Sequence, residues 1–420
     1  MTTTFPGGAS GVPRRRTAAS ASSAASSTTH VPVLQRPLAS FYLVSVCTGL
    51  LVAIGLVMVF SASSVRAYAT YGSSYRIVLN QALFVGLGIP GMWVASRIPA
   101  RAWRRLALPL LLGSIALLVL VLVPGIGRGV DGARRWIPLV GGFTLQPSEI
   151  AKLAALLWGA DLLVRKRKLL GDWKHLLVPL VPLFGFLALL VMLEPDMGTT
   201  IVLMSILMAL LWVVGAPLRV FGAILGVALS LGALLAVTEP YRMARLTSFV
   251  DPCAAHQRLD GGYQACQGLQ ALTSGGVFGL GLGASSEKWA GGLPNPYTDY
   301  VYAIIGEELG LLGSLTVLLL FATLVYAGFR IARRTKDPFA RLAATAITVW
   351  VAVQALVNIG TVVGLVPITG IPLPLISYGG SALVQTMIAL GVLLSFAREE
   401  PGAAAALRQQ RGRWRGLLRR

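Results

Sequence analysis

Long apolar runs separated by short polar segments set the pattern of this chain. Ten such runs can be marked, most of them about 20 residues long, which is the length of an α-helix that crosses the hydrocarbon core of a bilayer. Unpaired backbone groups are costly in lipid, so helices rather than open strands are expected. The prediction is an all-α polytopic membrane protein with about ten transmembrane helices. The predicted spans are residues 41–61, 77–95, 106–123, 147–164, 175–193, 198–214, 218–237, 300–329, 342–365 and 379–396.

Composition supports a membrane protein. Of the 420 residues, 55% are hydrophobic and only 12% are charged, and the mean hydropathy is +0.73. A soluble domain would carry about a quarter charged residues. The formal net charge of +20 would suggest a nucleic-acid partner in a soluble protein. In a membrane protein, basic loops that face the cytoplasm and anionic lipid account for it, so no nucleic acid is expected.

The basic residues fall on one side of the predicted spans. With ten spans, both tails and the loops that hold the basic clusters alternate onto the same side. The positive-inside rule therefore places both termini in the cytoplasm. The clusters are Arg101, Arg104 and Arg105; Arg165, Lys166, Arg167 and Lys168; Arg219; and Arg330, Arg333, Arg334 and Lys336.

The segments outside the spans define the remaining regions. Residues 1–40 are rich in Ser, Thr and Ala and lack the apolar core of a signal peptide, so a disordered basic cytoplasmic tail is expected. Residues 398–420 form a second basic cytoplasmic tail. Between them lies the ten-helix domain, 41–397, whose large extracytoplasmic loop, 238–299, joins the seventh and eighth helices. Long loops in compact proteins are often functional.

Two of the three cysteines lie in the large outer loop. Cys47 falls in the first span and is expected to be inert packing. Cys253 and Cys266 lie in an oxidising compartment, which favours a disulfide over two free thiols. Closing a loop of about a dozen residues would contribute roughly 3 kcal/mol in the chain-entropy model.

Polar groups near the outer ends of the spans are candidate functional residues, because such groups are costly at membrane depth. The stretch "GARRWIPLVGGFTLQPSEIAK" contains Arg134, Glu149 and Lys152. Glu149 and Lys152 are three residues apart and can pair on one helical face. For this pair, a substrate role and a simple helix start with an ion pair are equally open. Asp196, in "EPDMGTT", is either functional or the N-cap of the sixth helix.

The large outer loop and the start of the eighth span carry further charged candidates. Arg242 and Arg245 share a helical face and could simply contact lipid headgroups, but a single arginine would suffice for that, and two guanidinium groups suit a diphosphate or a carboxylate. Asp299 is either an N-cap or a functional acid. Glu307 and Glu308 lie inside the span and would need Arg or Lys partners from other spans, so we interpret them as supporting groups.

The segment between the ninth and tenth spans, "GLVPITGIPLPLISYGGSA", is apolar but dense in Pro and Gly. Non-helical backbone at membrane depth is tolerated only where it is buried in protein or lines a cavity. A re-entrant segment that closes a cavity is therefore predicted, with Ser377 among its few polar groups.

Taken together, these stretches resemble the SEDS family (shape, elongation, division and sporulation) over about residues 41–396. The resemblance rests on "GARRWI", "QPSEIAK", "EPDMGT", "RLTSFVDP", "GGYQ", "LPNPYTDYVYAIIGEELG" and "PITGIPLPLISYGGS". The "SSEKW" segment looks more like the division-type FtsW branch than like the elongation-type RodA branch. The basic tails and the cysteine pair look like an actinobacterial version.

The resemblance implies a peptidoglycan glycosyltransferase that polymerises lipid II into glycan strands at the outer face of the plasma membrane, at the division septum. The catalytic acid of the family falls in "YTDY", which gives Asp299 as the general base; Tyr297 stands where His is common. The leaving undecaprenyl diphosphate needs cations. Its candidate binding residues are Arg242, Arg245, Lys288, Arg134, Lys152 and Glu149, and the supporting residues are Asp196, Gln264, Glu307, Glu308 and Ser377.

The resemblance also implies partners. These are a class B penicillin-binding transpeptidase of the FtsI type, other divisome proteins and membrane lipids. The three histidines are scattered and no P-loop occurs, so neither a zinc cluster nor a nucleotide site is expected. A divalent cation, Mg²⁺ or Mn²⁺, could assist the diphosphate, but the sequence shows no dedicated cage for it.

Three functions compete at this point. A polymerase needs its polar groups at one face, whereas a lipid II flippase needs them along a path to both faces. The predicted acids cluster at one face, which disfavours the flippase. A scaffold that only anchors division partners would not need acids inside a span. An elongation-type polymerase differs from the division type only in its branch of the family.

Overall fold

The structure is a computed structural model that describes residues 38–130, 133–138, 144–169, 177–238, 249, 251–254, 262–289 and 291–403. The chain divides into two units, Met1–Arg36 and Pro37–Arg420. The first unit lies outside the described residues, as do most of the predicted C-terminal tail and much of the large outer loop. The second unit holds every element discussed below.

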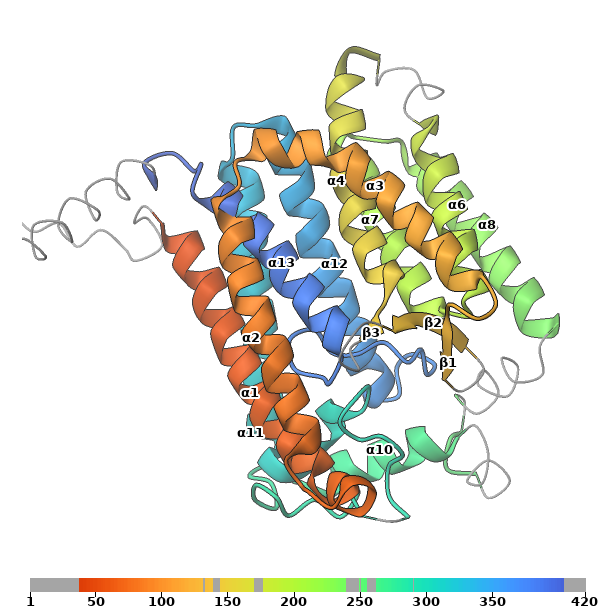
Figure 1. Cartoon of the computed structure of the whole chain (residues 1–420), viewed down its shortest axis with the longest axis vertical. Helices are drawn as coiled ribbons and strands as arrows, with labels where there is room; N and C mark the ends of the chain where they lie inside the picture. The colour runs from red at the N-terminus through yellow and green to blue at the C-terminus, as the bar shows by residue number, and fades with distance from the viewer. Residues whose placement is uncertain are drawn as a thin grey trace, which may run out of the picture. The chain divides into compact units, whose positions relative to one another are not determined.

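Ten long helices in the described part of the chain match the ten predicted spans, so the predicted fold class is confirmed (Figure 1). Six of them are long and apolar enough to cross a membrane, and α6, α7 and the described start of α8 are shorter apolar helices. The helices are α1 (Ala39–Tyr71), α2 (Arg76–Arg97), α3 (Ala100–Leu122), α4 (Pro147–Arg165), α6 (Leu180–Leu193), α7 (Met197–Val213), α8 (Leu218–Thr238), α11 (Val301–Arg334), α12 (Pro338–Val362) and α13 (Gly380–Ala397).

Helix α4 is less apolar than the other helices because protein, not lipid, surrounds it. Nearly every residue from Pro147 to Leu163 is buried. It packs against α3, α7 and α12. Side chains of α2, α3 and α11 that point away from the bundle are instead large and apolar, as lipid contact requires.

A small antiparallel sheet in the connection between α3 and α4 was not predicted. It has the order β1-β2-β3, with β1 (Arg128–Val130), β2 (Ala133–Pro138) and β3 (Thr144–Leu145). Val130 pairs with Ala133, so β1 and β2 are neighbouring antiparallel strands. The sequence between the two strands is Asp-Gly, which is a strong hairpin signal.

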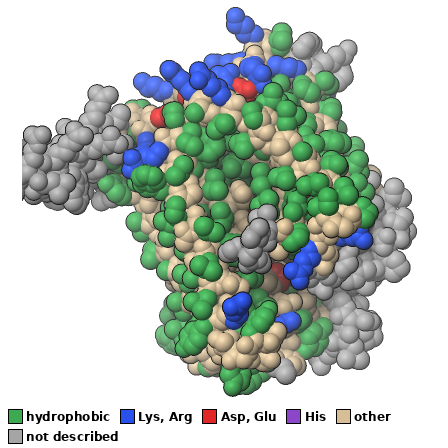
Figure 2. Space-filling view, viewed as in Figure 1, with side chains coloured by type: hydrophobic (Ala, Val, Ile, Leu, Met, Phe, Trp, Pro, Cys, Tyr) green, Lys and Arg blue, Asp and Glu red, His purple; other side chains and the backbone are tan. Residues whose placement is uncertain are grey.

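Basic side chains gather at one end of the helix bundle. Figure 2 shows Lys and Arg concentrated over the end of α2, the start of α3 and the end of α4. Arg97 is in the last turn of α2 and Arg165 in the last turn of α4. The helices α2 and α4 therefore both begin at the opposite end of the bundle, and that end carries the cavity described below.

The two cysteines of the outer loop are joined in the structure. Cys253 and Cys266 form a disulfide, with Cα atoms 5.0 Å apart, a separation typical of such bonds. Cys266 belongs to α10 (Tyr263–Ser274), so the bridge ties the preceding loop to this helix. The free thiol of Cys47 is buried, as expected.

Reduction of this bridge is expected to change the peptide map of the protein. A non-reducing digest should contain one peptide pair that joins Cys253 to Cys266, and the pair should separate on reduction. The unfolding temperature should fall as well, because the bridge contributes about 3 kcal/mol in the chain-entropy model. Identical maps under both conditions would rule out the bridge.

Candidate functional site

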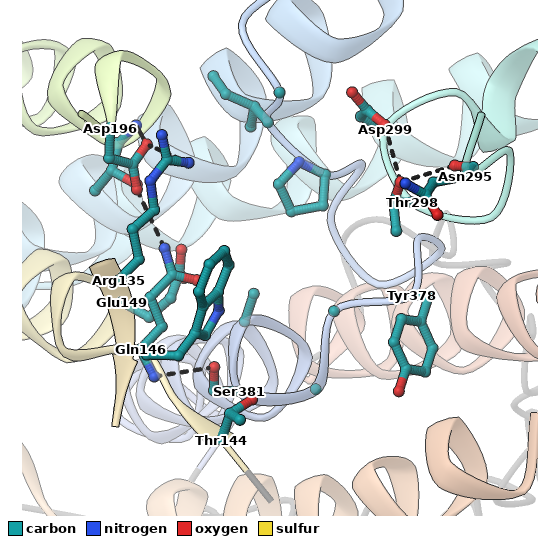
Figure 3. Close-up of a pocket in the computed structure, with 18 of the residues that line it drawn as sticks. Arg135, Thr144, Gln146, Glu149, Asp196, Asn295, Thr298, Asp299, Tyr378 and Ser381 are labelled. Carbon is teal, nitrogen blue, oxygen red and sulfur yellow. Dashed lines mark hydrogen bonds and ion pairs between the residues drawn. The ribbon is translucent and has the colours of Figure 1, made fainter. Parts of the chain in front are cut away.

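A polar cavity of about 840 Å³ opens at the end of the bundle away from the basic cluster (Figure 3). It is lined by the starts of α2, α4 and α13, by β2 and β3, by the turn between α6 and α7, and by α12. The segments 294–299 and 370–372 close it. The candidates that line it are Glu149, Lys152, Asp196, Gln264 and Asp299.

The backbone of Asp299 is held by helix α12. Its carbonyl accepts a hydrogen bond of 2.7 Å from Nδ2 of Asn358, and the same Nδ2 donates to the carbonyl of Ile371 at 2.7 Å. The hydroxyl of Thr298 lies 2.9 Å from Oδ1 of Asp299. The side chain of Asp299 is only half-buried and lines the cavity. One amide of α12 thus fixes both the acid-bearing turn and the Pro-rich segment after α12.

Glu149 and Lys152 form the buried ion pair that their spacing predicts. Nζ of Lys152 is 2.8 Å from Oε1 of Glu149, and the exposed fractions of the two side chains are 1% and 4%. Lys152 also donates to Oε1 of Gln354 at 3.2 Å and lies 4.7 Å from the ring centre of Trp350. The second carboxylate oxygen of Glu149 is buried without a hydrogen-bond partner among the described residues. It is an acceptor beside the cavity.

Asp196 is both an N-cap and a cavity residue. Its carboxylate accepts from the backbone N–H of Thr199 at 3.0 Å, so the predicted cap of α7 is present. It also accepts from Nε2 of Gln146 at 3.1 Å. Nη1 of Arg135 lies 4.0 Å away, and the same guanidinium donates to the carbonyls of Glu194 and Pro195. Arg135 therefore fastens β2 to the turn between α6 and α7 (Figure 3).

Glu194, in the same turn, is fully buried, and neither of its carboxylate oxygens has a hydrogen-bond partner among the described residues. Its pKa is raised to about 8, mainly by burial and also by the neighbouring Asp196 carboxylate, while Arg135 partly opposes the shift. A carboxyl group in this setting carries a proton at neutral pH.

The stability of the protein is therefore expected to fall as the pH rises from about 5 to about 8. In this window the native state holds a proton on Glu194 that the unfolded chain has released, so the slope is negative, on the order of 1 kcal/mol per pH unit at most. Glu194→Gln should flatten this part of the curve. The test is the unfolding temperature in detergent against pH, and an unchanged slope in the variant would contradict the assignment.

The structure does not bring every candidate to the cavity. Arg134 is exposed on β2 and does not line it, whereas the adjacent Arg135 does. Lys288 also lies away from the cavity lining: its Nζ donates to the carbonyl of Gly283 and is 3.6 Å from Oε1 of Glu308. Arg242 and Arg245 lie outside the described residues.

Glu307 and Glu308 have partners, and one of them is a cation as expected: Lys288 pairs with Glu308 at 3.6 Å, although it comes from the loop after α10 and not from another span. Glu307 accepts from the hydroxyls of Ser285 and Ser286, at 2.5 and 2.8 Å. Glu308 accepts from the hydroxyl of Ser61 at 2.6 Å. The loop after α10 thus supplies most of the donors, because it folds back onto the start of α11.

Ser377 also supports the structure rather than facing the cavity. Its hydroxyl accepts from the backbone N–H of Leu373 at 2.9 Å. Its carbonyl accepts from Nε2 of Gln81 in α2 at 3.1 Å. These bonds hold the Pro-rich segment in the compact, non-helical form that the sequence predicted.

Several residues that line or support the cavity were missed. Arg76 begins α2 at the end of the bundle away from the basic cluster, where an arginine departs from the positive-inside pattern. Gln354 and Asn358 are amides four residues apart inside the apolar helix α12. An i, i+4 pair of buried amides in a membrane span is a signal that could have identified one functional face.

The cavity residues do not fit a dedicated site for a divalent cation. In the described part of the chain, no group of three or more His, Cys, Asp or Glu side chains could hold a metal ion. Glu149 is paired with Lys152, and Asp196 is engaged by Thr199 and Gln146.

The fold and the cavity define the class: an all-α polytopic membrane protein with a cavity, lined by carboxylates and cations, at one end of its helices. The FtsW/RodA/SpoVE family model, described as "Cell cycle protein", matches residues 41–401. The chain therefore belongs to the FtsW/RodA/SpoVE family, and the resemblance found in the sequence is confirmed.

Two relatives show how far the similarity extends. A protein of Mycobacterium tuberculosis named "Probable peptidoglycan glycosyltransferase FtsW" is 44% identical over 378 residues, which cover 90% of this chain and 71% of the relative. Stage V sporulation protein E of Bacillus subtilis is 39% identical over 358 residues, covering 85% of this chain and 96% of the relative.

Two solved structures share the fold. One is described as "Structural coordination of polymerization and crosslinking by a peptidoglycan synthase complex"; it matches with a TM-score of 0.68 and 28% identity over 85% of this chain and 98% of that chain. The other is the rod shape determining protein RodA of Thermus thermophilus, with a TM-score of 0.62 and 27% identity over 85% of this chain and 96% of that chain.

Proposed function

We propose that this protein is a peptidoglycan glycosyltransferase that polymerises lipid II at the outer face of the plasma membrane during cell division. The observation that carries the proposal is a half-buried carboxylate, Asp299, in a polar cavity that also holds the charges of Arg76, Arg135 and Lys152. The relatives named FtsW and the similarity to a peptidoglycan synthase complex support the same reaction.

Asp299 acts as the general base. The 4-hydroxyl of the acceptor sugar gives its proton to the carboxylate as its oxygen attacks the anomeric carbon of the donor. The new glycosidic bond forms as the bond from that carbon to the diphosphate breaks, so one-step displacement inverts the anomeric centre. The hydrogen bond from the Asn358 side chain to the carbonyl of Asp299 keeps the base in one place while the lipid-linked substrates exchange.

Cationic groups stabilise the charge that grows on the leaving undecaprenyl diphosphate. Arg76 and Lys152 line the cavity and are the described residues best placed for this role, and Arg135 adds its field beside Asp196. Arg242 and Arg245 remain candidates from the sequence. Lys288 and Arg134 do not line the cavity, so we propose supporting roles for them.

The proposed location rests on the orientation of the cavity, and the proposed partners rest on the relatives. The cavity opens at the end of the helices opposite the basic cluster, which is the outer end by the positive-inside rule. A class B penicillin-binding transpeptidase is the proposed partner, since one structural relative coordinates polymerisation with crosslinking. Division-septum localisation and other divisome contacts rest on the similarity to proteins named FtsW.

The purified protein, with and without its transpeptidase partner, should convert labelled lipid II into glycan strands that separate by size. A lipid II flippase is the second candidate, and it would translocate labelled lipid II across vesicles without forming polymer. Polymer formation supports the proposal. Translocation without polymer would reject it in favour of the flippase.

A further inference from the structure

An apolar segment of the outer loop is exposed beside the start of α11. More than half of each side chain of Val277, Phe278, Leu280 and Leu282 is exposed, and Phe278 reaches 81%. Residues 275–284 contain no polar side chain. Large apolar groups gathered on one exposed segment are costly in water and mark contact with lipid or with protein.

This segment is bonded to a break in α11. The break lies at Gly310, whose φ of 67° and ψ of −164° are not helical. The N–H groups of 280–281 donate to the carbonyls of 307–308, at 2.9 and 3.0 Å. The carbonyls of 276–277 accept from the N–H groups of 311–312, at 2.9 and 3.2 Å. The backbone groups that the break frees are thus satisfied, which is the condition for non-helical backbone at membrane depth.

Two contacts between α1 and α11 fix the depth of the break. Arg330 donates to the hydroxyl of Ser40 at 3.1 Å, and the hydroxyl of Ser61 donates to Glu308 at 2.6 Å. About 20 residues separate the two contacts along each helix, or roughly 30 Å, which equals the thickness of the hydrocarbon core. Arg330 belongs to the predicted cytoplasmic basic set, so the contact at Arg330 marks the inner boundary of the hydrocarbon core. Glu308, one core thickness away, therefore lies at the outer boundary.

The apolar segment continues the lipid-facing surface of α11. Leu311, Leu312, Leu315 and Leu319 are exposed along this helix, on the part that crosses the hydrocarbon core. The segment is hydrogen-bonded to the first two of them, so it lies where this surface reaches the membrane boundary. Trp289, also exposed, follows at the polar end of the segment, as is typical of residues at the membrane–water interface.

We propose that residues 277–282 insert Val277, Phe278, Leu280 and Leu282 into the outer leaflet as an interfacial anchor. The ligand is the acyl-chain and glycerol region of the lipids. The depth of the break and the continuity with the leucines of α11 favour lipid over a protein partner. The anchor fixes the loop after α10, and with it the segment that carries Asp299, at a set height above the bilayer. The anchor does not depend on the proposed reaction.

The test is the depth of a fluorophore in the full-length protein. Phe278→Cys, and separately Leu282→Cys, are labelled with an environment-sensitive fluorophore and reconstituted in phosphatidylcholine–phosphatidylglycerol vesicles. Quenching is measured with nitroxide lipids labelled near the headgroup and with aqueous iodide. Labelled wild type gives the background, since Cys47 is buried and the other two cysteines are bonded.

Matched controls come from both sides of the boundary. Leu319→Cys reports the hydrocarbon core, because Leu319 is 67% exposed on α11. Gln270→Cys reports water, because Gln270 is exposed on α10. Probes at 278 and 282 are expected to lose fluorescence to the nitroxide lipids and to resist iodide. Quenching by iodide to the extent seen at 270 overturns the anchor, and so does shielding from both quenchers, which would mean that protein covers the segment.

Discussion

Asp299→Asn is expected to abolish glycan polymerisation, with a rate loss of about 10² to 10⁴-fold, the range for removing a general base. An amide cannot take the proton of the attacking hydroxyl. The fold should survive, because Asn358 binds the backbone carbonyl of residue 299 and Thr298 can still approach an oxygen at Oδ1. The measurement is the yield of polymer from labelled lipid II, with the unfolding temperature taken in parallel.

Asp251→Asn is the matched control, because Asp251 is an exposed acid of the same outer loop that does not line the cavity. This variant should polymerise lipid II like the wild type. If Asp299→Asn retains wild-type polymerisation, Asp299 is not the base. If Asp299→Asn lowers both the yield of polymer and the unfolding temperature, Asp299→Glu provides the next comparison. This variant restores the carboxylate and should recover part of the activity only if the negative charge is required.

The number and order of the membrane helices could be predicted because each span is a continuous apolar run, which is a local property of the sequence. Their ends could not all be predicted. Helix α1 continues to Tyr71, well beyond the predicted end at residue 61, because leaving the lipid does not end a helix. It ends where Gly72 adopts a left-handed conformation and donates to the carbonyl of Tyr68.

The cavity was only partly predictable because its residues meet through tertiary contacts. Glu149 and Lys152 could be paired from their spacing, but their neighbour Gln354 lies about 200 residues away in the chain. Arg134 and Arg135 are adjacent on a strand, where successive side chains point to opposite faces. Choosing which of the two meets the turn at Asp196 requires the register of β2, which the sequence did not supply.

Lys152→Met is expected to destabilise the protein by about 3–5 kcal/mol, because it leaves the buried carboxylate of Glu149 without its counter-ion. Gln354 keeps a donor in this variant, since its Oε1 still accepts from Trp350 Nε1 at 2.7 Å. The loss of stability should therefore come from the unpaired charge of Glu149 and not from a Gln354 amide that lacks a hydrogen-bond donor. The measurement is the free energy of unfolding in detergent, or the unfolding temperature where unfolding is irreversible.

The double variant Glu149→Gln with Lys152→Met separates structure from function. Removing both charges of a buried pair is often neutral for stability, so most of the lost stability should return. Polymerisation should remain lost, because the cavity then lacks both the ammonium for the diphosphate and a carboxylate acceptor. If polymerisation returns together with stability, the pair serves only to hold α4 against α12, and the charges that stabilise the leaving group must be sought at Arg76 and Arg135.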